Sequence, residues 1–368
     1  MNHYEKLNTS APYDRTQLQT LGWSEYFEQQ LLSMDTPHNR IVRVVSAQRG
    51  LFLVSDGKAE WLCSVAGRLL HFRDGNHPVT GDWVLVNDTI ITSILTRKNI
   101  LSRGEAGSHG NHEATVKREQ AIAANLNTVF IVCGLDRDFN TKRLERYLTL
   151  VHNYGLTPVV VLTKADLHDA PELFQFEVES IALGTPVVLT SMVDNRGHGE
   201  LETYLAQGQT VAMIGSSGAG KSTLLNALHG DDIQVTSTVS KSGGKGRHTT
   251  TTRELIRMPQ GGMLMDNPGI REIAFYEDGQ GLENTFREIE TLARRCRFAD
   301  CYHQQEPGCA VLHAVETGDL KHARLVSYHK MKREMQYLSD RRTKSADRIE
   351  KERWQDIALR IRQMHKMK

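Results

Sequence analysis

Short apolar runs separated by turn residues fill the first part of the chain. Between about residues 40 and 95 these runs are rich in Val, Ile, Leu and aromatic residues, and Gly, Asp and Asn interrupt them. The pattern is typical of short strands joined by tight turns. Five strands are expected, in IVRVV, GLFLVS, AEWLCSV, GDWVLVN and TIITSIL. They predict a small closed barrel of the OB type, although another five-stranded barrel fits the same pattern.

The segments on either side of these strands lack a strong apolar period. Residues 1–37 are polar, with one helical candidate around residues 23–32. Residues 97–117 contain three glycines with several basic residues and histidines, which is typical of a linker or mobile loop. We therefore expect an N-terminal extension over 1–37 and the barrel over 38–100.

After residue 119, apolar strands alternate with amphipathic helices. Such alternation indicates a parallel α/β sheet covered by helices. From residue 282 the pattern is helical, interrupted by a cluster of cysteines. The sequence thus predicts an α/β domain over 113–275 and a helical domain over 276–368. The strands are expected in NTVFIVCGL, TPVVVLT, TPVVLTS, QTVAMIG, LIRMP and GGMLMDNPG, and the helices in TKRLERYLTLVHNYG, PELFQFEVESIAL and KSTLLNAL.

Length and composition agree with a multidomain globular protein. A chain of 368 residues with 39% apolar residues should form two or three domains. No run approaches the roughly 18 apolar residues of a membrane helix. The first fifteen residues, MNHYEKLNTSAPYDR, lack the pattern of a signal peptide. We therefore expect a cytoplasmic monomer without a membrane partner.

The charge of the chain is unevenly distributed. The total is only +1, but from Lys321 to the end fifteen Lys or Arg face six Asp or Glu, a net charge of +9. The rest of the chain therefore carries −8. A basic C-terminal block favours an anionic partner such as nucleic acid, although a solvated charged helix would give the same composition.

A glycine-rich loop follows the apolar strand QTVAMIG and precedes a helix. Its sequence GSSGAGKS matches G-x-x-x-x-G-K-S in the context that this phosphate-binding motif requires. The glycines let backbone N–H groups point at the β-phosphate, Lys221 brings a cation to the β/γ oxygens, and the Ser222 hydroxyl ligates Mg²⁺. An ordinary glycine-rich turn fits less well. The predicted site comprises Gly215, Ser216, Ser217, Gly218, Ala219, Gly220, Lys221, Ser222 and Thr223.

Further candidates for the magnesium side lie downstream. The strand MLM ends in D-x-x-G, where Asp266 can hold the metal through water and the Gly269 amide can contact the γ-phosphate. The polar, glycine-containing segment 231–252 lies between the two motifs and predicts a mobile loop. A threonine there, assigned to Thr250, could close onto Mg²⁺ when the γ-phosphate is present, as GTPase switches do.

A tetrad that could read the base follows the strand TPVVVL. Thr163, Lys164, Ala165 and Asp166 resemble the N-K-x-D signature of GTPases, with Thr in place of Asn. The Asp166 carboxylate can accept from guanine N1–H and the 2-amino group, a donor pair that adenine lacks. Lys164 would lie over the ring, and Ser191 belongs to a second base-contacting loop. In ordinary GTPases such loops follow the phosphate loop, so the chain order here indicates a circular permutation.

The combination of these motifs resembles the ribosome small-subunit-dependent GTPase A (RsgA) family, over nearly the whole chain. The resemblance rests on the barrel, EQAIAANLNTVFIV, TKAD, GSSGAGKSTLLN, GRHTTT, DNPGIRE and the cysteine cluster. It implies a circularly permuted GTPase that acts late in assembly of the small ribosomal subunit, with GTP, GDP, that subunit and its rRNA as partners. Thr163, Asn267 and the N-terminal stretch depart from the family pattern.

The resemblance also bears on hydrolysis. Many GTPases orient the attacking water with a Gln directly after D-x-x-G, whereas Ile270 stands there in this chain. The family is grouped with GTPases that carry a hydrophobic residue at this point. With Lys221 as the phosphate-binding catalytic group, His248 is the candidate for orienting the water. Slow intrinsic turnover, raised by the ribosomal partner, is expected.

Three cysteines and a histidine near residue 300 predict a metal site. Cys296, Cys301, His303 and Cys309 supply three thiolates and one imidazole, which fill a tetrahedral Zn²⁺ shell. Four protein ligands leave no open position, so the ion would be structural. Buried free cysteines with a surface histidine are the alternative, and spacing together with the resemblance favours zinc. Basic helical patterns follow at 320–338 and 347–366 and could lie along rRNA.

Two readings from other classes stay open at this point. A P-loop ATPase or phosphotransferase would share the phosphate loop, but the TKAD tetrad disfavours it. An RNA-binding protein with a vestigial nucleotide site would not need to retain Lys221, Ser222 and Asp266. A small-subunit GTPase with Mg²⁺ and one structural Zn²⁺ accounts for the most features.

Overall fold

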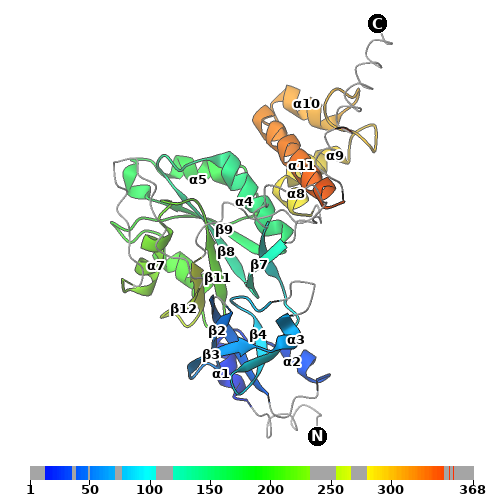
Figure 1. Cartoon of the computed structure of the whole chain (residues 1–368). Helices are drawn as coiled ribbons and strands as arrows, with labels where there is room; N and C mark the ends of the chain where they lie inside the picture. Colours follow the sequence, from blue (N-terminus) through cyan, green and yellow to red (C-terminus); the bar gives the residue numbers. More distant parts are fainter. Residues whose placement is uncertain are drawn as a thin grey trace, which may run out of the picture.

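The computed structural model places three parts in a row (Figure 1). The barrel lies toward the N-terminal end, the central sheet follows, and the helices after residue 280 lie toward the C-terminal end. Among the described residues, none of the helices has both the length and the apolar character needed to span a membrane. The structure describes residues 13–34, 39–48, 50–70, 77–104, 119–232, 254–266, 280–343, 348 and 351.

The N-terminal strands form the expected closed barrel, with strand order β1-β2-β3-β5-β4. A short helix, α3 (Gly67–Leu70), lies between the third and fourth strands, and β3 pairs with β5 in parallel. This topology is that of an OB-type barrel. The strands are β1 (Arg40–Gln48), β2 (Leu51–Ser55), β3 (Glu60–Val65), β4 (Trp83–Asn87) and β5 (Ile90–Ile94).

The N-terminal extension contributes two helices, α1 (Arg15–Thr20) and α2 (Glu25–Leu31), where one was expected. Asp14 caps the first by accepting from the Gln17 amide. Trp23 meets the ring of Trp83 edge-on at 4.8 Å, so these helices are packed onto the barrel. The sequence did not predict this packing, because residues 1–37 are mostly polar and only a few large apolar side chains make the contact.

The linker expected at 97–117 is partly wrong. Residues Ile100–Gly104 form β6, which pairs antiparallel with β7 (Glu119–Ala124) in a separate two-stranded sheet. Leu101 is fully buried and Ile100 packs against the same core, so two apolar residues hold a strand whose other residues are polar or glycine. Residues 105–118 lie outside the described part of the chain.

A six-stranded sheet with order β10-β9-β8-β11-β13-β12 forms the centre. All neighbouring pairs are parallel except β12 and β13. Every residue of β8 and β11 is buried, which explains their unbroken apolar sequences. The strands are β8 (Thr128–Gly134), β9 (Thr157–Thr163), β10 (Val187–Leu189), β11 (Thr210–Ile214), β12 (Leu255–Arg257) and β13 (Met263–Asp266).

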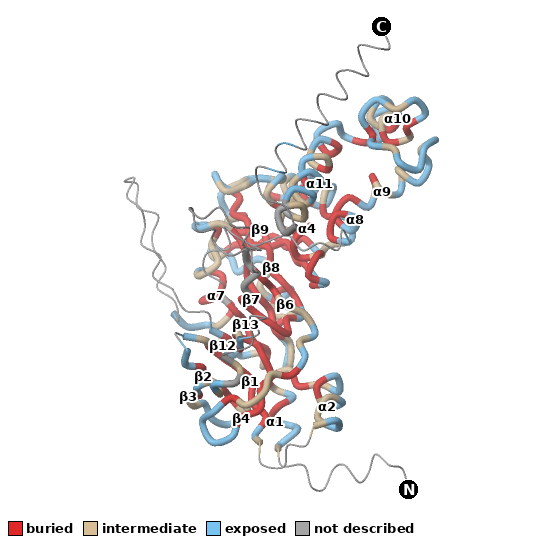
Figure 2. Tube along the Cα trace, turned by 45° about the vertical axis from the view of Figure 1, so that its right-hand side comes forward, coloured by how far each residue is buried: buried red, intermediate tan, exposed pale blue. Residues whose placement is uncertain are grey.

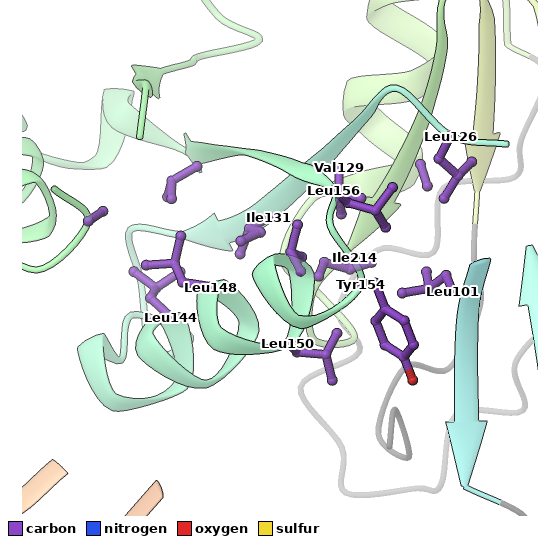
Figure 3. Close-up of a cluster of buried hydrophobic side chains, with 14 of the residues drawn as sticks. Leu101, Leu126, Val129, Ile131, Leu144, Leu148, Leu150, Tyr154, Leu156 and Ile214 are labelled. Carbon is purple, nitrogen blue, oxygen red and sulfur yellow. The ribbon is translucent and has the colours of Figure 1, made fainter. Parts of the chain in front are cut away.

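Helices cover this sheet and fill the core against it. Leu144 and Leu148 of α4 pack toward the strands that carry Val129, Ile131 and Ile214 (Figure 3). Buried residues accordingly concentrate along the central strands and inside the barrel (Figure 2). The connecting helices are α4 (Thr141–Asn153), η2 (Ala165–Leu167), α5 (Glu172–Glu179), α6 (His198–Glu202), η3 (Thr203–Leu205) and α7 (Lys221–His229).

The C-terminal part is helical, as expected, and packs against α4. The Gly281 amide donates to Asn153 Oδ1 at 2.9 Å, and the Arg146 guanidinium pairs with Glu334. The second basic helical pattern, at 347–366, lies almost wholly outside the described residues. The helices are α8 (Gln280–Thr285), α9 (Arg287–Ala293), α10 (Ala310–Thr317) and α11 (His322–Thr343).

Candidate functional site

The phosphate loop connects β11 to α7 through glycines with positive φ. Gly215 has φ +152°, and a Cβ there would lie 2.2 Å from the Val132 carbonyl oxygen of the neighbouring strand. Gly218 and Gly220 adopt φ +84° and +94°. Residues with side chains rarely adopt these angles, so glycine is required for the loop to curl. The curl aims the N-terminus of α7 into the loop, which favours an anion there.

Lys221, the first residue of α7, reaches back over this loop. Its Nζ donates to the carbonyl oxygens of Gly215 at 2.9 Å and Ser216 at 2.7 Å. The cation therefore lies against the concave backbone that the motif uses for phosphate. Ser222 follows on the same helical turn, and Thr223 after it.

The tetrad predicted to read the base contacts the phosphate loop directly. Thr163 is buried, and its hydroxyl donates to the Ala219 carbonyl at 2.6 Å. Lys164 has φ +63° and donates from Nζ to the Gly218 carbonyl at 2.7 Å. Because the two loops touch, a single nucleotide can place its base at the tetrad and its phosphates in the phosphate loop. The Thr163 hydroxyl uses its hydrogen for the Ala219 carbonyl. Contact of Thr163 with guanine therefore stays a prediction.

Asp166 and Ser191 lie on the two loops that follow β9 and β10. The Asp166 residue is exposed, as a carboxylate that must reach a ligand requires. The Ala165 amide donates to the Thr190 carbonyl at 3.1 Å, which joins the two loops. Ser191 is buried, and its hydroxyl accepts from the Val193 amide at 3.1 Å.

The magnesium side is described only in part. The last residue of β13, Asp266, is in register with Met213, one residue before the end of β11. This pairing places Asp266 and the phosphate loop at the same edge of the sheet. Thr250, His248 and Gly269 lie outside the described residues.

Three charged residues after β8 contact the two loops and were not predicted from the sequence. Asp136 Oδ2 accepts from Lys164 Nζ at 2.7 Å, and Asp138 accepts the hydroxyl of Ser216. Arg143 Nη1 donates to Ser216 Oγ at 2.8 Å. Partial burial opposes ionisation of Asp136, but the Lys164 ammonium and a backbone amide outweigh it and lower the pKa of that carboxyl.

A sequence signal for these residues does exist. They follow β8, which lies between the strands that carry the two motifs, and carboxyl ends of adjacent parallel strands meet at one edge. An acidic D-x-D segment (Asp136–Asp138) in that turn was therefore a candidate for contact with both loops.

The cysteine cluster comes together as expected. The ligand atoms of Cys296, Cys301, His303 and Cys309 all lie within 4.8 Å of one another, so the four residues can hold a metal ion. The Cys296 and Cys309 sulfurs are 3.8 Å apart, which is too long for a disulfide. His303 Nδ1 lies 3.4 Å from the Cys309 sulfur and 3.6 Å from the Cys296 sulfur.

The loop that presents these ligands is held independently of any ion. Glu306 accepts from the amides of Tyr302, Gln304 and Gln305 at 2.8–3.0 Å. Partial burial opposes ionisation, yet these amides lower the pKa of Glu306 to about 2. Burial lowers the pKa of His303, so its ring is neutral and able to act as a ligand at neutral pH.

Comparison with known proteins identifies the family. The RsgA GTPase family profile matches residues 94–276. Small ribosomal subunit biogenesis GTPase RsgA of Methanosarcina acetivorans is 43% identical over 300 residues, covering 80% of this chain and 79% of that protein. RsgA 2 of Vibrio vulnificus is 41% identical over 347 residues, covering 93% and 94%.

A solved structure agrees with this assignment. The crystal structure of YjeQ from Thermotoga maritima matches with a TM-score of 0.59 at 30% identity, covering 81% of this chain and 98% of YjeQ. The match extends well beyond the phosphate loop, so it does not rest on one motif. The permuted order of the strands, the joined nucleotide loops and these relatives together show that the chain belongs to the RsgA GTPase family.

Proposed function

We propose that this protein is a GTPase that binds the small ribosomal subunit and hydrolyses GTP to time a late step of its assembly or the release of a factor. The observation that carries the nucleotide part is the contact between the two loops, Thr163 to Ala219 and Lys164 to Gly218. One guanine nucleotide can span both. The ribosomal part is supported by relatives named for small-subunit biogenesis.

Each part of the site has a distinct role in this proposal. The amides of Gly218, Ala219 and Gly220 and the Lys221 ammonium bind the β- and γ-phosphates, and Asp166 accepts from the guanine edge. Ser191 shapes the second base loop. Lys221 stabilises the negative charge that shifts among phosphate oxygens during hydrolysis.

Oxygen donors on the magnesium side fit a hard divalent cation. The Ser222 hydroxyl begins α7 beside the loop, and Asp266 ends the strand paired with β11. Ser222, Asp266 and Thr250 would hold Mg²⁺, and Gly269 would contact the γ-phosphate. Mg²⁺ bound there neutralises charge on the phosphates. His248 is proposed to orient the attacking water, because Ile270 cannot donate or accept a hydrogen bond.

The metal cluster is proposed to hold one structural Zn²⁺. Three sulfurs and one nitrogen at mutual distances within 4.8 Å suit tetrahedral zinc and leave no open position for chemistry. Exposed Lys330, Lys332 and Arg333 on α11 add a basic surface that can contact rRNA phosphates. We also propose that the protein acts in the cytoplasm, because its relatives are named for ribosome biogenesis, and that it acts as a monomer.

The domain boundaries form part of the same proposal. The extension 1–37 and barrel 38–100 precede a permuted GTPase domain over 113–275, which runs into the metal-binding helical domain 276–368. The segment after D-x-x-G leads directly to α8. Nucleotide state could therefore act on the C-terminal domain through the chain itself.

A competition experiment tests the guanine assignment against an ATPase or phosphotransferase. Labelled GDP bound to the full-length protein is displaced with unlabelled GTP, ATP or xanthosine triphosphate. We expect displacement by GTP at concentrations at least about a hundredfold below ATP, because adenine lacks the donor pair that Asp166 reads. Equal displacement by ATP would refute the guanine reading. A vestigial site would not retain the labelled GDP in the first place.

A further inference from the structure

Asp138, which lies between β8 and α4, and Arg143, in the first turn of α4, hold the hydroxyl of the second residue of the phosphate loop. Ser216 donates to the Asp138 carboxylate, and Arg143 Nη1 donates to Ser216 Oγ at 2.8 Å. Arg143 Nη1 also pairs with the same Asp138 oxygen at 2.5 Å. The three groups thus meet at one point. Hydrogen bonds to ionised groups are about twice as strong as neutral ones, so this contact can fix a loop.

The two charged residues are themselves rigidly placed. Asp138 Oδ2 accepts from the Gly134 amide at 3.4 Å, and its side chain is only 12% exposed. Arg143 lies in the first turn of α4, where Asn140 caps the helix by accepting from the Arg143 amide at 3.1 Å. The next residue, Leu144, packs toward the sheet (Figure 3). The end of β8 therefore positions Asp138, and the capped, core-packed first turn of α4 positions Arg143.

Their contact with the loop does not compete with a nucleotide. Lys221 holds the loop through the carbonyls of Gly215 and Ser216, and it must weaken these bonds in order to serve phosphate oxygens. Asp138 and Arg143 instead hold the Ser216 side chain. They can keep the same backbone curl while Lys221 is engaged with phosphate.

We propose that Asp138 and Arg143 are positioning residues that keep the phosphate loop in its nucleotide-binding shape through the Ser216 hydroxyl. The inference rests on the proposed function, since it assigns these residues to the same nucleotide site. Neither side chain needs to contact the nucleotide. A loop that is already ordered loses less conformational freedom on binding, so the network raises affinity for GDP and GTP alike.

The test is a double-mutant cycle with labelled GDP and full-length protein. Ser216→Ala removes the shared hydroxyl with minimal change in volume, and Arg143→Gln removes the cation. Each should weaken GDP binding roughly tenfold, and the double variant should lose clearly less than the sum of the two single losses in free energy, because both substitutions act through the Ser216 hydroxyl. Arg143→Lys keeps a cationic donor and should restore part of the affinity.

Arg146→Gln is the matched control. It removes an ion pair of the same helix, but that pair is directed at Glu334 of α11 and not at the loop. GDP affinity should be unchanged in this variant. Unchanged affinity in both single variants, or additive losses in the double variant, would overturn the positioning role. Failure of the wild-type protein to bind GDP or GTP would instead refute the proposed function.

Discussion

Arg324 on α11 donates to the carboxylate of Glu145 on α4 at 2.7 Å, and both side chains are only 5% exposed. The same guanidinium donates to Glu288 at 2.6 Å and to the Thr285 carbonyl at 2.5 Å. It also lies 4.2 Å from the centre of the Phe286 ring. A buried, fully engaged cation therefore joins the C-terminal helices to the helix that borders the phosphate loop.

Removing this cation should strongly destabilise the protein. Arg324→Met leaves the Glu145 carboxylate buried without its partner, a loss worth about 3–5 kcal/mol in comparable cases. The free energy of unfolding, measured with urea, should fall by that order. Arg333→Met, an exposed position on the same helix, is the control and should change little. A decrease in the free energy of unfolding below roughly 1 kcal/mol for Arg324→Met would show that this contact does not hold the C-terminal helices to α4.

The phosphate loop can be tested through its lysine. Lys221→Ala removes the cation that serves the β- and γ-phosphates, so GTP hydrolysis should be abolished while zinc content and thermal midpoint are retained. Lys142→Ala, on an exposed position of α4, is the control. The measurement is phosphate release at saturating GTP. Retained turnover in Lys221→Ala would refute the assigned role.

Specificity for guanine is predicted to reside in one carboxylate. Asp166→Asn replaces an acceptor with a donor, which suits the 2-oxo group of xanthine and disfavours the 2-amino group of guanine. Preference should shift from GTP toward xanthosine triphosphate by more than roughly tenfold. The ratio of the two hydrolysis rates measures it, with exposed Asp169→Asn as control. An unchanged ratio would exclude Asp166 as the base reader.

The metal cluster predicts one zinc per chain. Cys309→Ser removes a ligand that also caps α10, where its sulfur accepts from the Leu312 amide. If the cluster holds a structural zinc, as we propose, the variant should lose the ion and part of its thermal stability. Labelled GDP should still bind, because the cluster contributes no group to the nucleotide loops. Zinc is measured by atomic absorption. Cys63→Ala, a buried thiol of the barrel, should keep the ion.

Apolar patterns predicted most of the fold because burial on both faces leaves an unmistakable signal. The unbroken strand β8 is such a case. The phosphate loop was found from the spacing of its glycines and lysine, and it leads into α7 as expected. The cysteine cluster was found for a similar reason, since its ligands are close in sequence. Sites whose residues are close in sequence can therefore be predicted from the sequence.

Contacts between distant polar residues could not be predicted in this way. Arg43 lies in the strand IVRVV, where the sequence alone indicates no partner for it. It is buried and donates to the Thr210 hydroxyl at the start of β11 and to the Asn125 carbonyl. Arg324 belongs to the basic C-terminal block, for which an anionic partner or a solvated helix was expected. Their partners come from other elements, so only the tertiary structure reveals that these charges are satisfied inside the protein.

We expect the small ribosomal subunit to control the rate of GTP hydrolysis by this protein. The most direct measurement is the rate of GTP hydrolysis by the full-length protein with and without saturating purified small subunits, with Lys221→Ala as the blank. We predict a rise of at least roughly tenfold with small subunits, and none in the variant. An equal rate with and without small subunits would contradict the account.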